Sequence, residues 1–190
     1  MTDNRTKLAV YDLDGTLFDT SRVNWLSYQE AVRPYGADID YAYFRDFCNG
    51  RHYTEFVPAL LGGKADEEQL KVIHAAKKAA YQKYLGEARM NWALFDGIRA
   101  QRDQMHTAIV TTASRKNTEE ILDHFAVREL FELILTQENI TKVKPDPQGF
   151  LMAMEYFGIP AECTVIYEDS DVGIEAARRS GALVLRAVQF

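Results

Sequence analysis

The 190-residue chain has little cysteine, no long apolar run and no excess of positive charge. Its two cysteines, Cys48 and Cys163, lie far apart, which disfavours a disulfide scaffold and favours two small buried apolar side chains. No apolar run approaches the roughly 18 residues of a membrane span, and the start, MTDNRTK, lacks the apolar core of a secretory signal. We therefore expect a cytoplasmic protein with no membrane partner.

The charge balance and composition exclude further classes. Lys plus Arg number 22 against 28 for Asp plus Glu, a net charge of −6, which disfavours binding to nucleic acid. With 47% hydrophobic and 26% charged residues, no repeat and no low-complexity segment, the chain is neither disordered nor fibrous. Its length predicts one folded domain, or one domain that carries an insertion.

Strand and helix patterns alternate over most of the chain. The apolar run Lys7 to Tyr11 predicts a buried strand, which ends in a turn at Asp12–Thr16 where Gly15 permits unusual backbone angles. Further strands are expected at His106–Thr112, Leu133–Thr136, Thr164–Tyr167 and Ala182–Leu185, and helices at Asn117–Phe125, Pro147–Phe157 and Val172–Ser180. This alternation predicts an α/β fold with a doubly wound parallel sheet, covered by helices on both faces.

A helical block interrupts this pattern between about Arg22 and Arg89. Its clearest helix is Asp66–Tyr84, which opens with acidic residues and closes with lysines. One face of that helix is expected to carry Leu70, Ile73, Ala76, Ala80 and Tyr84. We therefore predict a core domain formed by residues 1–19 and 92–190, and a helical cap domain formed by residues 20–91.

Polar residues follow the predicted strands at the end where ligands bind in open parallel sheets. They are Asp12, Asp14, Thr111, Thr112, Lys144, Glu168, Asp169 and Asp171. Carboxylates gathered at one point repel one another unless a cation shares the site, and oxygen ligands suit Mg²⁺. Lys144, the Thr111 hydroxyl and the backbone N–H groups near Gly15 and Thr112 would face a small tetrahedral anion. This combination indicates phosphoryl chemistry.

Four segments, in order along the chain, resemble the four motifs of the haloacid dehalogenase superfamily. They are Asp12-Leu13-Asp14-Gly15-Thr16-Leu17-Phe18-Asp19-Thr20, Val110-Thr111, Lys144-Pro145-Asp146-Pro147, and Tyr167-Glu168-Asp169-Ser170 with Gly173, Ala176 and Ala177. The resemblance points to the β-phosphoglucomutase-like and phosphoglycolate phosphatase-like branch. The second aspartate of the first motif, Asp14, favours phosphoryl transfer over halide displacement.

The resemblance implies a covalent mechanism that depends on Mg²⁺. Asp12 would attack the phosphorus of a small phosphate monoester, and Asp14 would protonate the leaving oxygen and later activate water. The metal ligands would be Asp12, the backbone carbonyl of Asp14, Glu168 and Asp169. Thr111 and Lys144 would hold the transferring group, and Gly15, Thr16 and Thr112 would line the phosphate site. Asp171 is expected to be an acid at a helix N-terminus, and Asp19 to organise the loop into the cap.

The cap carries a looser match. Cys48-Asn49-Gly50-Arg51-His52-Tyr53 resembles a substrate-contacting loop of β-phosphoglucomutase-like members, and Lys77 lies near the position of a cap lysine. These matches make Arg51, His52 and Lys77 candidates for substrate binding. The alternatives are ordinary cap packing for His52 and Tyr53, and an exposed helix position for Lys77. Asn24 stands where the sugar-phosphate mutases carry a histidine, which weakens a mutase interpretation.

The leading hypothesis is a Mg²⁺-dependent phosphatase for a small phosphorylated metabolite, acting as a monomer or weak homodimer. A phosphomutase is the near alternative. A receiver-type signalling module also combines acidic residues, a threonine and a lysine on a parallel sheet, but it has no helical insertion after the first strand. A non-catalytic binding protein has no need for Asp12, Asp14, Glu168 and Asp169 together.

Overall fold

The computed structural model describes residues 4–63, 65–187 and 190, so residues 1–3 of the amino-terminal segment considered above lie outside it. The chain divides into two compact units. One unit, called here the α/β unit, contains the residues up to Asp19 and from Arg89 onwards; the other, the helical unit, is Thr20–Ala88. No helix among the described residues is both long and apolar enough to span a membrane.

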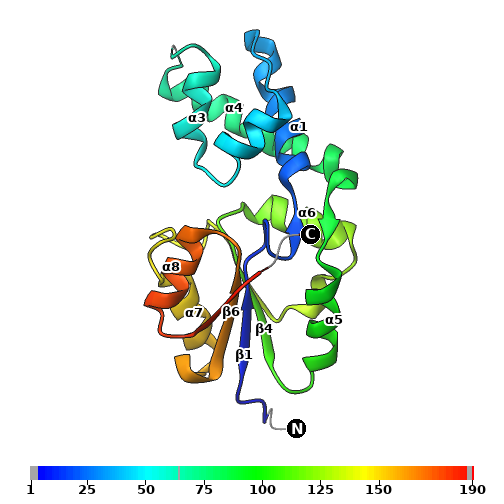
Figure 1. The fold of residues 1–190 in the computed structure, drawn as a ribbon, viewed down its shortest axis with the longest axis vertical. Coiled ribbons are helices and arrows are strands. Elements are labelled where there is room, and N and C mark those ends of the chain that lie inside the picture. The colour runs from blue at the N-terminus through cyan, green and yellow to red at the C-terminus, as the bar shows by residue number, and fades with distance from the viewer. Residues whose placement is uncertain (1–3, 64, 188–189) are drawn as a thin grey trace. The chain divides into compact units, whose positions relative to one another are not determined.

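A five-stranded parallel sheet forms the centre of the α/β unit, with the strand order β5-β4-β1-β6-β7 (Figure 1). Its strands are β1 (Leu8–Tyr11), β4 (His106–Val110), β5 (Leu133–Leu135), β6 (Thr164–Glu168) and β7 (Leu183–Arg186). Each lies where the apolar runs predict one, so the predicted α/β fold with a doubly wound parallel sheet is confirmed. The strand order changes direction at β1, which places β1 in the middle of the sheet.

Helices cover both faces of this sheet, as Figure 1 shows with α7 and α8 on one side and α5 on the other. Leu8 of β1 belongs to a buried cluster with Phe150 of α7. On the opposite face, Tyr11 meets the ring of Phe131, which in turn contacts Phe95 of α5. The helices of this unit are α5 (Trp92–Gln101), α6 (Arg115–His124), α7 (Gln148–Phe157) and α8 (Asp171–Arg179), with single 3₁₀ turns at η4 (Arg128–Leu130) and η5 (Ala161–Cys163).

Two features of the α/β unit were not predicted. Strands β2 (Phe18–Asp19) and β3 (Arg89–Met90) pair antiparallel, and each is too short to show a period of two in the sequence. Helix α5 also lies outside the predicted elements. The strand expected to reach Thr112 ends at Val110, because the Thr111 hydroxyl accepts a hydrogen bond from the N–H of Ala113 at 3.0 Å and turns the chain.

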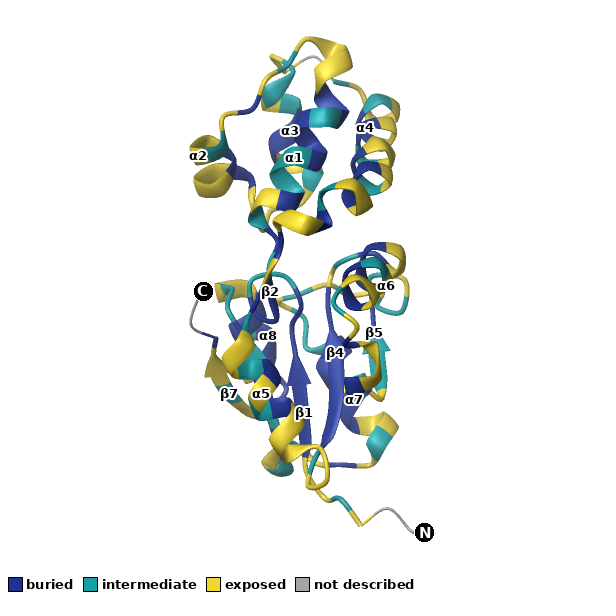
Figure 2. Cartoon of the chain, turned by 90° about the vertical axis from the view of Figure 1, so that its right-hand side faces the viewer, coloured by how far each residue is buried: buried dark blue, intermediate teal, exposed yellow. Residues whose placement is uncertain are grey.

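Helices packed around a separate apolar core form the second unit. They are α1 (Ser21–Val32), α2 (Tyr41–Tyr43), α3 (Tyr53–Leu60) and α4 (Glu67–Ala80), with shorter turns η1 (Arg33–Tyr35), η2 (Phe44–Cys48) and η3 (Tyr81–Glu87). Tyr28 and Val32 of α1 share one buried cluster with Phe56 of α3 and Ile73 of α4. Figure 2 shows these buried faces in dark blue. The sequence correctly predicts several helices here.

The predicted helix Asp66–Tyr84 differs from α4 in two ways. Helix α4 ends at Ala80, where the chain tightens into the 3₁₀ turn η3. The buried face of α4 holds Lys77 in place of Ala76, which is exposed. The second difference follows from helix geometry, since positions 70, 73, 77 and 80 keep the 3.6-residue period better than position 76 does. The side chain of Lys77 is covered because it lies over the rings of Tyr28 and Tyr81.

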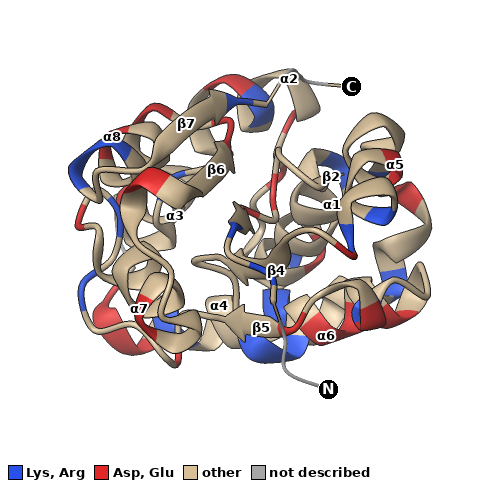
Figure 3. Cartoon of the chain, turned by 90° about the horizontal axis from the view of Figure 1, so that it is seen from below, with Lys and Arg blue, Asp and Glu red and all other residues tan. Residues whose placement is uncertain are grey.

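Charged residues of both signs are interspersed along the ribbon in the view of Figure 3. Several of the Lys and Arg residues pair with nearby acids, as Arg5 does with Glu132 and Arg179 does with Glu175.

Candidate active site

The loop after β1 meets the end of β6 around the side chain of Asp169. The backbone N–H of Asp12 donates to the carbonyl of Tyr167 at 3.0 Å, which extends the pairing of β1 with β6 by one residue. Gly15 has a φ of 90°, and a Cβ there would lie 2.2 Å from Oδ2 of Asp169. The Thr16 hydroxyl donates to Oδ1 of Asp169 at 3.0 Å. A glycine is therefore required at position 15 both by the backbone angle and by the close approach of the carboxylate.

Lys144 joins three segments that lie far apart in the sequence. Its Nζ donates to Oδ1 of Asp12 at 2.5 Å and to Oε1 of Glu168 at 2.7 Å. A third, longer contact of 3.4 Å reaches the carbonyl of Val110 at the end of β4. The side chains of Lys144 and Asp12 are each 9% exposed and that of Glu168 is 1% exposed, so these charges are buried together. The parallel sheet brings the predicted residues to one place, as expected from their positions after the strands.

Burial and mutual repulsion disfavour the ionised forms of two of these acids. Burial raises the pKa of Asp12 well above its usual value, and the charges of Glu168 and Asp169 raise it further, while Lys144 opposes them. Burial likewise raises the pKa of Asp169 to about 6, with a contribution from Glu168. Burial alone would lower the pKa of Lys144, but Asp12 and Glu168 raise it above its ordinary value, so Lys144 stays protonated. One lysine faces three carboxyl groups, which leaves the cluster short of positive charge.

This shortage suits a small divalent cation. Asp12 and Asp169 carry carboxylate oxygen atoms, which hard cations prefer. Within residues 4–63, 65–187 and 190, no three His, Cys, Asp or Glu side chains already form a metal-binding group.

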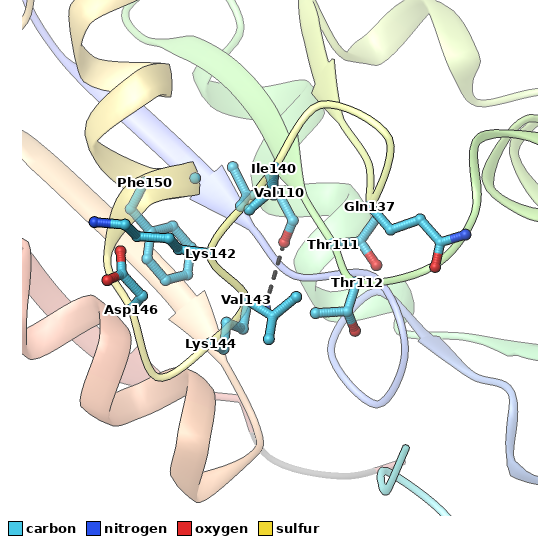
Figure 4. A pocket seen from close by; sticks show the side chains of 11 residues that line it. Val110, Thr111, Thr112, Gln137, Ile140, Lys142, Val143, Lys144, Asp146 and Phe150 are labelled. Carbon is cyan, nitrogen blue, oxygen red and sulfur yellow. Dashed lines mark hydrogen bonds between the residues drawn. The ribbon is translucent and has the colours of Figure 1, made fainter. Parts of the chain in front are cut away.

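Thr111 and Thr112 lie beside this cluster, around a small pocket that Lys144 also lines (Figure 4). Thr111 is buried, and its N–H donates to the carbonyl of Leu135 at 2.9 Å, which fixes its position between β4 and β5. Its hydroxyl proton can still be donated, because the bond from Ala113 uses only the oxygen. Thr112 is exposed. A hydroxyl and an ammonium group on one rim of a pocket can hold an anion.

Two other acids of the motifs take structural positions. Asp171 begins α8, its side chain is 92% exposed, and it accepts a hydrogen bond from Arg186 at 2.6 Å. Asp19 pairs with Arg89 at 2.6 Å across the β2–β3 ribbon. The expected helix-start position of Asp171 is confirmed. Asp14 lies in the loop after β1, is half-buried, and forms an isolated β-bridge with Phe18.

Two residues that support the site were not among the predicted site residues. Ser170 donates to Oε2 of Glu168 through its N–H at 2.7 Å and its hydroxyl at 3.0 Å, and the same hydroxyl caps α8. Asn91 donates from Nδ2 to the carbonyl of Thr16 at 3.1 Å, and its side chain caps α5. Both residues could have been found from the sequence as helix caps, since Ser or Asn before a helical pattern is a capping signal.

The three cap candidates belong to the helical unit and differ in exposure. Arg51 is exposed, and His52 is exposed with its Nδ1 2.7 Å from the hydroxyl of Thr54. Lys77 is only 9% exposed, so its interpretation as an exposed helix lysine is wrong. Its ammonium lies 5.4 Å and 4.9 Å from the centres of two tyrosine rings, a distance at which cation–π attraction operates.

Comparison with known proteins gives one family and several relatives. The model of the family described as haloacid dehalogenase-like hydrolase matches residues 9–187. A phosphoglycolate phosphatase from Thiobacillus denitrificans is 32% identical over 94% of this chain and 81% of its own length. A validoxylamine A 7′-phosphate phosphatase from Streptomyces hygroscopicus subsp. limoneus is 27% identical over 92% of this chain and 82% of its own.

A solved structure shows the same fold. CbbY from Rhodobacter sphaeroides, crystallised in complex with phosphate, aligns with a TM-score of 0.83 and 24% identity. The alignment covers 97% of this chain and 87% of the other. Since the four motifs, the sheet order and these similarities agree, the superfamily resemblance stated from the sequence is confirmed.

Proposed function

Because the chain belongs to the haloacid dehalogenase-like hydrolase family, we propose that it is a Mg²⁺-dependent phosphatase acting through an aspartyl-phosphate on Asp12. The named relatives are phosphatases, which supports a phosphoric monoester hydrolase acting on a small phosphorylated molecule. The observation that carries the proposal is the buried cluster in which Lys144 joins Asp12 and Glu168 at 2.5 Å and 2.7 Å.

Asp12 is the proposed nucleophile. Its Oδ2 attacks the phosphorus, the bond from phosphorus to the ester oxygen breaks, and Asp14 gives its proton to that oxygen, so an alcohol leaves. Lys144 and the hydroxyl of Thr111 would hold the transferring oxygens as their negative charge is redistributed. The attacking form of Asp12 is the carboxylate; Lys144, which donates to Oδ1, opposes the rise in the pKa of Asp12 and so favours that form.

The second half of the reaction returns the enzyme to its starting state. Asp14, now ionised, takes a proton from water, the water oxygen attacks the phosphorus of the aspartyl-phosphate, and Asp12 leaves as a carboxylate. The products are one alcohol and one inorganic phosphate for each ester and water consumed. Asp14 thus acts first as an acid and then as a base, which requires it to exchange protons with the leaving group and with water.

The metal in this proposal would be held by Asp12, Asp169 and the backbone carbonyl of Asp14, with Glu168 directly or through water. When bound, Mg²⁺ would supply positive charge to the phosphoryl oxygens. The fit rests on the all-oxygen donor set and on the raised pKa values of Asp12 and Asp169, which indicate too little positive charge around buried carboxyl groups.

Inorganic phosphate release from a panel of phosphate monoesters tests this function. The panel should include sugar phosphates together with phosphoglycolate and validoxylamine A 7′-phosphate, the compounds for which two relatives are named. We expect Mg²⁺-dependent release from at least one ester, loss of release in EDTA, recovery with Mg²⁺ and weaker recovery with Ca²⁺. Full activity in EDTA would remove the metal from the mechanism, and no release from any ester would overturn the proposal.

Product analysis separates hydrolysis from transfer between two positions of a sugar phosphate. A mutase would convert the substrate into an isomer with little phosphate released. Asn24, at the position where mutases carry a histidine, makes hydrogen bonds to Thr20 from both its backbone N–H and its side-chain amide. An amide does not act as a general acid or base near neutral pH, so Asn24 supports a hydrolase over a mutase.

A further inference from the structure

The carboxylate of Glu168 occupies the space that a side chain at position 173 would fill. A Cβ built on Gly173 would lie 1.7 Å from Oε1 of Glu168, 2.0 Å from Cδ and 2.4 Å from Oε2. No carbon atom can approach these atoms so closely, so any other residue at position 173 would displace the carboxylate. Gly173 lies in the first turn of α8, three residues after the helix cap Ser170.

The two oxygens of this carboxylate accept hydrogen bonds from different residues. Oε1 accepts from Nζ of Lys144 at 2.7 Å, and Oε2 accepts from the N–H and the hydroxyl of Ser170 at 2.7 Å and 3.0 Å. The hydroxyl of Ser170 also accepts from the N–H of Gly173 at 3.1 Å. The carboxylate is thus held at the start of α8, where the N–H groups favour negative charge, and from there it reaches Lys144.

Space, rather than backbone conformation, is the reason for a glycine at position 173. Gly173 is absent from the glycines with positive φ, so other residues could adopt its backbone angles. Glycine is also a poor helix former, and nothing about α8 itself favours it there. Gly15 is different, because its φ of 90° requires glycine whatever its neighbours are. Gly97 in α5 has no heavy atom within 4 Å of an ideal Cβ and makes a matched comparison.

We propose that Gly173 is a positioning residue: by lacking a side chain, it lets Glu168 lie against α8 and orient Lys144 for phosphoryl transfer. The inference rests on the proposed function, because it assigns Lys144 to the transferring group. The three atoms that a methyl group at position 173 would approach most closely all belong to the end of the Glu168 side chain. The fold can therefore absorb Gly173→Ala by moving the carboxylate, whereas the hydrogen bond from Lys144 to Oε1 cannot survive the movement.

The Gly173→Ala variant, compared with Gly97→Ala, tests the inference. We expect kcat to fall roughly tenfold or more in Gly173→Ala, with a melting temperature close to that of the wild type, since only a side-chain end is displaced. Gly97→Ala makes the same chemical change in open space and should leave kcat unchanged. Wild-type kcat in Gly173→Ala would overturn the inference. Failure of Gly173→Ala to fold, with Gly97→Ala folded, would also overturn it, because the glycine would then serve the fold.

A shorter acid should relieve the clash. In the double variant Glu168→Asp/Gly173→Ala, the carboxylate is withdrawn by one methylene, and we expect kcat to recover about fivefold relative to Gly173→Ala. If the effects of Glu168→Asp and Gly173→Ala on kcat simply multiply in the double variant, the added methyl group acts elsewhere and the inference is overturned.

A crystal structure of Gly173→Ala separates this inference from the proposed function. We expect the carboxylate of Glu168 to have left Lys144, and a carboxylate still within hydrogen-bond distance of Nζ would overturn the inference. This result does not depend on turnover. A wild-type protein that hydrolyses no phosphate ester would instead overturn the proposed function, and the crystal structure would still decide what Gly173 positions.

Discussion

The α/β unit and the helical unit use buried charge in different ways. In the α/β unit, buried Lys144 is hydrogen-bonded to two carboxylates from separate strands. In the helical unit, buried Lys77 lies over the aromatic rings of Tyr28 and Tyr81. The first arrangement has the acids, hydroxyls and cation of a reaction centre, and the second is a lysine stem packed within an apolar core. We infer that the α/β unit carries the chemistry, and that the helical unit contributes specificity through its exposed polar groups.

The largest expected effect comes from the nucleophile. Asp12→Asn should lower kcat at least about 10³-fold on every substrate, because an amide is not a useful nucleophile. Folding should survive, since the amide has the size of the carboxylate and Lys144 keeps its hydrogen bond to Glu168. Steady-state phosphate release and thermal unfolding measure the two effects.

Asp171→Asn is the matched control for that substitution. It makes the same change at an acid that follows β6 but whose side chain is 92% exposed and pairs with Arg186. Its kcat should stay within about twofold of the wild type, as expected for an exposed ion pair. A loss of less than about tenfold in Asp12→Asn would contradict the assignment of the nucleophile and the division of labour between the units.

A smaller and selective effect is expected in the helical unit. Arg51 is exposed and charged, which makes it our candidate for contact with the part of the substrate that does not react. Arg51→Ala should lower kcat/KM roughly tenfold for the best ester of the panel, while p-nitrophenyl phosphate changes little because it lacks that part. Equal losses on both substrates would show that Arg51 supports the fold or the reaction itself.

The smallest expected effect concerns stability alone. His74 in α4 stacks on Tyr53, and burial, with help from Lys77, Lys78 and His52, lowers its pKa to about 4. Between pH 6.5 and 4 the unfolded state then binds the proton more readily than the folded state does, so stability falls as the pH falls.

Substitution of His74 measures this contribution. From pH 7 to pH 4.5 the wild type should lose about 1 kcal/mol more unfolding free energy than His74→Gln, after allowance for the half-exposed position. Denaturant unfolding at both pH values gives the difference. Identical losses in the two proteins would contradict the buried, uncharged state of His74. A change in kcat of His74→Gln at pH 7 would contradict the inference that the α/β unit carries the chemistry.

The same contrast explains how far the sequence alone can go. Asp12, Thr111 and Glu168 could be placed together because each stands at the end of a predicted strand, and the carboxyl ends of parallel strands meet at one edge. Lys144 was predicted to join them from the turn before Pro147. Lys77 could not be placed, since its burial depends on two aromatic rings that no local pattern connects to it. The burial of Ala76 was predicted wrongly for a different reason, since position 76 departs from the 3.6-residue period of the buried face.

The contribution of Gly173 also lay beyond the sequence. In the sequence, Gly173 is only a motif residue three positions after Ser170. The structure shows that the carboxylate of Glu168 occupies the space that a side chain at position 173 would need. The β2–β3 ribbon was missed because strands of two residues have no readable period. Sequence patterns therefore predicted which groups meet, and the structure adds the contacts that hold them.

The most direct test of the central claim is detection of the phosphoryl group on the enzyme itself. Asp14→Asn should still accept the group from an ester with a good leaving group but lose it slowly, because water then lacks its base. Acid quenching during turnover, followed by peptide mass spectrometry, should find one phosphoryl group per chain on the peptide that contains Asp12. The same treatment of Asp12→Asn should find none. Phosphate release by the wild type with no phosphoryl group on Asp12 in the Asp14→Asn protein would contradict the claim.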